Sequence, residues 1–84
     1  MNPVQLEPFD ELIRELRAQG LPGADSLAAI RTSAWSSSSE MIGELGKAVL
    51  RIQSENRHTS GELGQIPGRC MEEVRKVWPG IRLP

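Results

Sequence analysis

The sequence of 84 residues predicts a small all-α domain of three to four helices. Three observations predict this class. Apolar residues recur at helical spacing in several segments, proline and glycine separate those segments, and no segment alternates apolar and polar residues convincingly over five positions. A chain of this length is too short to hold two hydrophobic cores, so we expect one domain over residues 1–84.

The first helix is predicted over residues 8–19. Proline suits the first helical turn, where Pro8 stands, whereas Gly20 and Pro22 are residues that end a helix. Four apolar residues follow the spacing i, i+3, i+4 and i+7, which places them on one side of the helix. They are Phe9, Leu12, Ile13 and Leu16.

A shorter helix is predicted over residues 25–33, after a turn at residues 21–24. Either Asp25 or Ser26 can cap its first turn through a side-chain oxygen. Its apolar side carries Leu27, Ile30 and Ala34. Thr32 and Ser33 weaken its end, because their hydroxyl groups compete for backbone hydrogen bonds.

The longest helix is predicted over residues 38–54. Four serines at residues 36–39 lie at its start, and Ser37 with Glu40 forms the capping-box pattern S-x-x-E directly before an apolar stretch. A single stripe about 120° wide then follows at 100° per residue. It contains Met41, Ile42, Leu45, Ala48, Val49 and Ile52.

The last helix is predicted over residues 67–78, from Pro67 to a stop at Pro79 and Gly80. Its stripe contains Cys70, Met71, Val74, Val77 and Trp78. Together the four stripes predict a common core. We expect this core to contain Phe9, Leu12, Ile13, Leu16, Leu27, Ile30, Leu45, Val49, Ile52, Val74, Val77 and Trp78.

Composition argues against several functional classes. The longest apolar run covers only residues 27–30, whereas a membrane helix needs about 20 apolar residues, and the first residues lack the pattern of a signal peptide. We therefore expect a cytoplasmic protein without a membrane partner. One cysteine and one histidine exclude an internal disulfide and a zinc site with several such ligands. Without a phosphate-binding loop or converging carboxylates, we expect neither a cofactor nor an enzyme.

Cys70 and His58 are the remaining residues with nucleophilic or basic chemistry. Cys70 lies near a predicted helix N-terminus, where the helix dipole can lower a thiol pKa, and His58 is the only candidate base. Cys70 also belongs to an apolar stripe, where a buried thiol acts as a small hydrophobic side chain. The second interpretation is favoured, because no further catalytic residue accompanies the pair.

Gly43 and Gly46 are unusual, because each costs roughly 1 kcal/mol relative to alanine inside a helix. They share a second side of the longest helix with Leu50 and Gln53, and the two glycines and the leucine form its possible contact face. This side either packs on the first or last helix of the same chain, or it forms a dimer seam or a partner groove. The second alternative predicts that Gly46→Leu abolishes self-association and leaves the fold intact.

Trp35 follows the second predicted helix in a hydroxyl-rich segment. An aromatic ring at this place can anchor the loop to the core or contact a partner. We therefore include it with Gly43, Gly46 and Leu50 among the candidate partner-binding residues.

The segment 59–78 weakly resembles a helix-turn-helix pattern. Its DNA contacts would come from Arg69, Arg75 and Lys76. Two features oppose this hypothesis. Pro67 and Arg69 occupy positions that should be apolar, and Glu72 with Glu73 would repel phosphates. The net charge of −1 also lacks the basic excess that is usual for DNA-binding domains.

The sequence therefore favours a small non-catalytic interaction module that docks through a helical face onto a protein partner or a second copy of itself. The alternative is a DNA-binding regulator that uses residues 59–78. DNA binding must weaken steeply with salt, whereas an apolar contact is nearly insensitive to salt.

Overall fold

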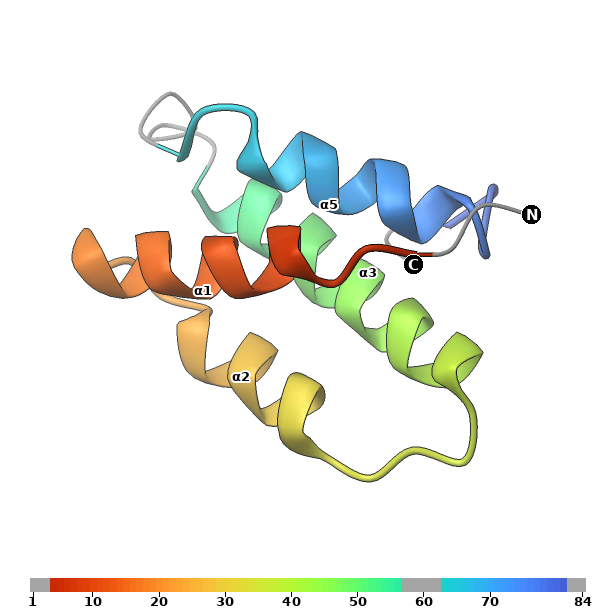
Figure 1. Ribbon diagram of the computed structural model, residues 1–84. Helices are drawn as coiled ribbons and strands as arrows, with labels where there is room; N and C mark the ends of the chain where they lie inside the picture. Colours follow the sequence, from red (N-terminus) through yellow and green to blue (C-terminus); the bar gives the residue numbers. More distant parts are fainter. Residues whose placement is uncertain (1–3, 57–62, 82–84) are drawn as a thin grey trace.

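The computed structural model describes residues 4–56 and 63–81. These residues form four helices and no strand, which confirms the all-α class: α1 (Glu7–Ala18), α2 (Ala24–Thr32), α3 (Ser38–Glu55) and α5 (Ile66–Arg75). α1 packs against α2 and α5, and α3 also packs against α2 and α5. Figure 1 shows the resulting compact arrangement, in which α3 runs between α2 and α5.

α1 follows the predicted pattern closely. Phe9, Leu12 and Leu16 are completely buried and Ile13 nearly so, which confirms the stripe. Pro8 lies in the first turn, as predicted. The helix ends at Ala18, and Gly20 then takes a positive φ of 66° that an L side chain disfavours.

α2 begins one residue earlier than predicted and uses a different cap. Neither Asp25 nor Ser26 caps it; the N-cap is Gly23, with φ of 109° and no side-chain hydrogen bond. A β-carbon at Gly23 would lie 2.6 Å from Cγ1 of Ile52, so the turn packs directly on α3. At the other end the hydroxyls of Thr32 and Ser33 donate to backbone carbonyls one turn earlier, as expected for residues that weaken a helix end.

The start of α3 confirms the predicted N-cap. Ser37 is the N-cap, and its hydroxyl oxygen accepts a hydrogen bond from the backbone N–H of Glu40 at 3.2 Å. The helix buries its apolar stripe apart from Met41, which is half-buried. Within the described ranges, no helix is both long and apolar enough to cross a membrane.

α5 ends at Arg75, three residues before the predicted end. The backbone N–H groups of Val77 and Trp78 both donate to the Val74 carbonyl oxygen, at 3.0 and 2.9 Å, as the chain leaves the helix. The Val77 bond spans three residues, as does the bond from the Lys76 N–H to the Glu73 carbonyl oxygen, so this turn is tighter than an α-helix and shifts the spacing that predicts the stripe. The expectation that Trp78 belongs to the core is wrong: its exposed fraction is 44%.

The core otherwise forms where the four helices meet. Ile30 and Val77 were expected inside it, but they are half-buried at its edge. Leu63, outside all predicted stripes, is buried and extends the core. Among the described residues, three ion pairs join α1 to its neighbours. The Arg31 guanidinium donates to both carboxylate oxygens of Asp10 at 3.0 and 3.1 Å, and Arg69 binds Glu11. The third pair is more exposed, with 3.7 Å between Arg17 Nη2 and Asp25 Oδ1.

Candidate functional site

Two tryptophans are the large hydrophobic side chains that stay exposed in the described part of the chain. The exposed fraction is 36% for Trp35 and 44% for Trp78. Both line one groove of about 500 Å³, and Figure 1 shows that the start of α3 and the end of α5 lie on the same side of the molecule. We call it the tryptophan groove; its residues are Trp35, Glu40, Gly43, Glu44, Lys47, Trp78, Pro79, Gly80 and Ile81.

Trp78 is fixed against the first turns of α3. Its indole Nε1–H donates to the Ser39 carbonyl oxygen at 2.8 Å. The ring can come this close because Gly43 has no side chain: a β-carbon there would lie 3.3 Å from Nε1. The glycine on the second side of α3 therefore admits an aromatic ring of the same chain.

Trp35 is fixed against the end of α2 in the same manner. Its Nε1–H donates to the Ile30 carbonyl oxygen at 2.8 Å. Ile30 belongs to the last turn of α2, where carbonyl groups lack a partner within the helix. Both indole N–H groups are thus bound to the backbone, so the two tryptophans offer ring carbons rather than hydrogen-bond donors to the groove.

Charged side chains border this apolar surface. Glu40 lies in the first turn of α3, where the helix dipole favours a negative charge. Glu44 and Lys47 form a half-exposed pair, with 3.6 Å between Oε1 and Nζ. Two carboxylates and one ammonium give the groove lining a formal charge of −1.

The structure separates the four predicted partner-binding residues. Trp35 and Gly43 meet in the tryptophan groove. Gly46 instead lies buried against the same chain, because a β-carbon there would be 2.6 Å from Cγ1 of Val74 and 2.8 Å from Cδ1 of Ile81. Leu50 is half-buried against the core.

The position of Gly46 favours packing within the chain, the first alternative for the glycine side. The expectation that Gly46→Leu leaves the fold intact is corrected for the same reason. A leucine at this position has no space beside Val74.

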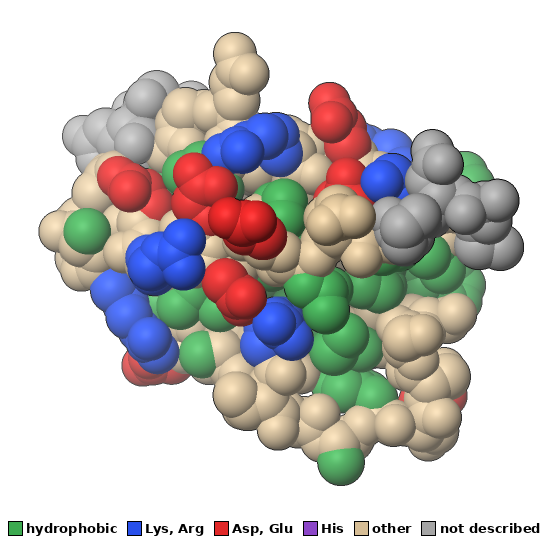
Figure 2. Space-filling model, viewed as in Figure 1, with side chains coloured by type: hydrophobic (Ala, Val, Ile, Leu, Met, Phe, Trp, Pro, Cys, Tyr) green, Lys and Arg blue, Asp and Glu red, His purple; other side chains and the backbone are tan. Residues whose placement is uncertain are grey.

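The basic residues of the DNA-binding alternative are largely engaged by acidic neighbours. Arg69 Nη2 lies 2.9 Å from Glu11 Oε1, and Lys76 Nζ lies 2.8 Å from Glu73 Oε1. Arg75 is exposed at the end of α5. Figure 2 shows acidic and basic side chains interspersed on one face of the molecule. Residues 59–62 of the proposed motif lie outside the described residues.

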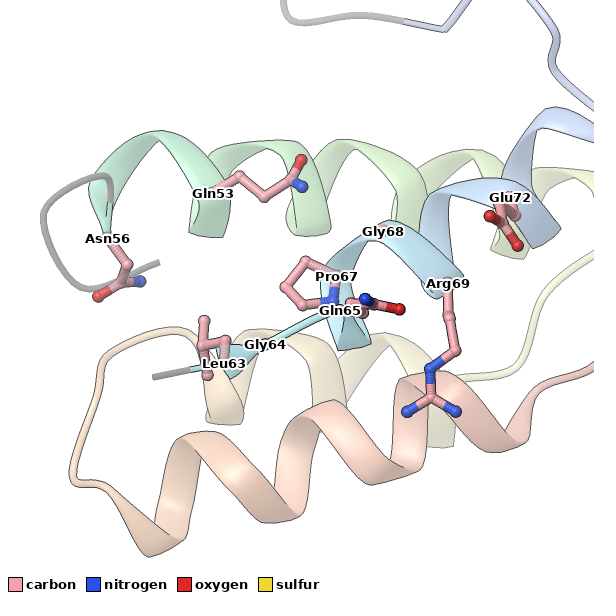
Figure 3. Close-up of a pocket in the computed structure, with 9 residues that line it drawn as sticks. All are labelled: Gln53, Asn56, Leu63, Gly64, Gln65, Pro67, Gly68, Arg69 and Glu72. Atoms are coloured by element: carbon pink, nitrogen blue, oxygen red, sulfur yellow. The ribbon is translucent and has the colours of Figure 1, made fainter. Parts of the chain in front are cut away.

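A second hollow, of about 400 Å³, lies between the end of α3 and the start of α5 (Figure 3). Gln53, Asn56 and Gln65 give it neutral amide groups. Figure 3 shows Arg69 directed toward α1, where it binds Glu11. Arg69 and Glu72 are the charged residues of its described lining.

Cys70 occupies the core, as its place in the apolar stripe predicts. Burial raises the pKa of its thiol to about 12, and this effect exceeds the lowering by the nearby Arg69. The thiol is therefore protonated at neutral pH and is a poor nucleophile. His58 lies outside the described residues, and the described ones contain no cluster of three or more side chains that could hold a metal ion.

Helical spacing in the sequence assigned Trp78 to the core. It therefore did not identify Trp78 and the turn after it as parts of the candidate site. Pro79 and Gly80 directly follow Trp78, and such residues mark the end of a helix. This signal could have shown that the helix ends before position 78 and that the Trp78 side chain lies outside the apolar stripe.

Comparison of the chain with protein-family models, with curated proteins and with solved structures found no match.

Proposed function

We propose that this chain is a small non-catalytic interaction module that holds a segment of a partner protein in the tryptophan groove. One observation carries the proposal: the two exposed tryptophans, 43 residues apart in sequence, line the same groove. Tryptophan is among the residues that contribute most to protein interfaces, because it buries a large surface with little loss of side-chain freedom.

The size of the groove indicates what it can hold. A volume of about 500 Å³ lies within the range of pockets that bind small ligands or a few side chains. A stable interface between folded subunits buries about 1,200–2,000 Å² in total, far more than two partly exposed rings provide. A short peptide segment or one face of a partner helix therefore fits the groove better than a second copy of this domain.

The test is affinity capture from the source cell with the full chain as bait. Wild type, Trp35→Ala and Gln53→Ala baits are compared, with nuclease treatment and with washes at low and high salt. Gln53 is an exposed control residue at the far end of α3. We expect to recover a bound protein after nuclease treatment and after the high-salt wash. Wild type and Gln53→Ala should capture equal amounts of it, whereas Trp35→Ala should capture about tenfold less or lower.

Two outcomes of this capture would contradict the proposal. One is a bound protein that Trp35→Ala retains as well as wild type does. The other is recovery of nucleic acid that is lost at high salt, which would favour the DNA-binding alternative and move attention to Arg69, Arg75 and Lys76. Circular dichroism of each bait verifies that the variants keep the helical fold.

A further inference from the structure

We infer that the partner segment places a cationic side chain, arginine or lysine, on the tryptophan rings, with an apolar residue beside it. This inference rests on the proposed function and names the chemistry of its partner. Its first support is the way in which the rings are held. Trp35 and Trp78 both use their N–H groups on backbone carbonyls, at 2.8 Å in each case.

A tryptophan whose N–H is already bound has little to offer an acceptor. Its ring faces carry the negative side of the aromatic quadrupole, which attracts cations. Trp35 and Trp78 both remain more than one-third exposed, so their rings are accessible to a ligand. An acidic segment would gain no hydrogen bond from these N–H groups and would meet the negative faces.

The charge of the groove lining favours the same partner. Glu44 is balanced by Lys47, with 3.6 Å between the charged atoms. Among the described residues no ion pair is formed by Glu40, which lines the groove together with both tryptophans. A carboxylate close to aromatic faces gives a cation both attraction and hydrogen-bond acceptors.

The rest of the lining accounts for the apolar part of the segment. Pro79 and the half-buried Ile81 form the side of the groove that follows α5. Arginine and lysine can lay their aliphatic stems on such a surface while the charged end reaches a carboxylate. A neighbouring apolar residue of the partner would then cover the remaining hydrophobic wall.

The experiment selects short random peptides displayed on phage against the immobilised full chain. The selection is repeated on Trp35→Ala and on the double variant Glu40→Gln/Glu44→Gln. Glu55→Gln serves as the matched control, because it removes a carboxylate at the opposite end of α3. Thermal unfolding of each variant shows that the fold persists.

We expect the enriched peptides to contain arginine or lysine beside an apolar residue. Enrichment should persist on Glu55→Gln and fall about tenfold on both the tryptophan variant and the double glutamate variant. A synthetic copy of an enriched peptide should lose about tenfold in affinity when glutamine replaces its cationic residue. This loss should shrink to about threefold or less on the double glutamate variant.

Failure of this inference differs from failure of the proposed function. Enriched peptides that depend on Trp35 but contain no cationic residue would overturn the inference and retain the docking function. Peptides that bind the tryptophan variant and the double glutamate variant as tightly as wild type would overturn the inference and the proposed function together. The absence of any enrichment would do the same. Enrichment of segments of this chain's own sequence would identify a second copy as the occupant and also contradict the inference.

Discussion

The indole nitrogen of Trp78 and the carbonyl oxygen of Ser39 lie 2.8 Å apart and join the chain beyond α5 to the first turn of α3. This hydrogen bond positions one wall of the tryptophan groove. It also holds the turn that carries Ile81 across Gly46. The geometry of the groove and the stability of the fold are therefore linked through one side chain.

Trp78→Phe tests this hydrogen bond, because phenylalanine keeps an aromatic ring and removes the donor. We expect the free energy of unfolding to fall by about 1 kcal/mol, measured by urea denaturation. Ser39→Ala is the control, since it keeps the backbone carbonyl that accepts the bond. It should change stability by less than about 0.5 kcal/mol. Equal stability of Trp78→Phe and wild type would show that the bond contributes nothing.

Gly46→Ala tests the close packing of α3 on α5. The added methyl group improves helix propensity by roughly 1 kcal/mol, but it meets the stiff side chain of Val74 at 2.6 Å. We expect a net loss of about 1–2 kcal/mol, because overpacking outweighs propensity. The same substitution at Gly68, in α5 with open space around it, should stabilise by about 0.5–1 kcal/mol.

A second substitution locates the strain in Gly46→Ala. Adding Val74→Ala removes the nearest methyl group that the new β-carbon would meet, at 2.6 Å, and leaves Cδ1 of Ile81 at 2.8 Å. In a double-mutant cycle the two changes should be less damaging together than the sum of their separate effects. Strict additivity would contradict the contact.

Glu73 makes the stability of the fold depend on pH, and the direction of this dependence follows from its pKa shift. Its carboxylate accepts hydrogen bonds from Lys76 Nζ at 2.8 Å and from the Gln5 N–H at 2.7 Å, and these donors lower its pKa from the ordinary 4.5. A lowered pKa in the folded state adds stability that is fully present above pH 4.5 and is lost as pH falls through the folded pKa.

Glu73→Gln should remove this acid-dependent contribution. Urea unfolding between about pH 6 and pH 3 should show a smaller decrease in stability for the variant than for wild type. Lys76→Met removes the donor with the larger effect and should reduce the same decrease. An equally steep decrease in all three proteins would exclude Glu73 as its source.

The buried thiol of Cys70 predicts slow chemical modification. With its pKa raised to about 12 by burial, little thiolate exists at pH 8, and the side chain is not exposed. A thiol-specific disulfide reagent should react roughly a hundredfold or more slowly with native protein than with urea-unfolded protein. Rapid modification of the native state would place Cys70 outside the core.

The four helices could be predicted because their apolar residues follow helical spacing. Phe9, Leu12 and Leu16 are buried as that spacing requires, and Ser37 caps α3 through its side chain as its pattern with Glu40 predicts. These features depend on residues a few positions apart, so the local sequence contains the information.

The tryptophan groove depends on contacts between distant segments. The sequence identified the glycine side of α3, but it could not decide that Val74, Trp78 and Ile81 cover part of it. Trp78 was assigned to the core by extending helical spacing past the point where α5 ends. Because α5 ends three residues before its predicted end, the ring of Trp78 lies in the candidate site and not in the expected core.

The most direct test of the docking role is a ¹H–¹⁵N correlation spectrum of the labelled chain with and without the captured protein. The two indole N–H signals report on Trp35 and Trp78, which are the two tryptophans of the sequence. We predict that both signals shift together with the backbone amides of residues 40–47 and 79–81. Changes confined to the exposed side of α5, or to the hollow at Gln53 and Gln65, with unmoved indole signals would contradict the account.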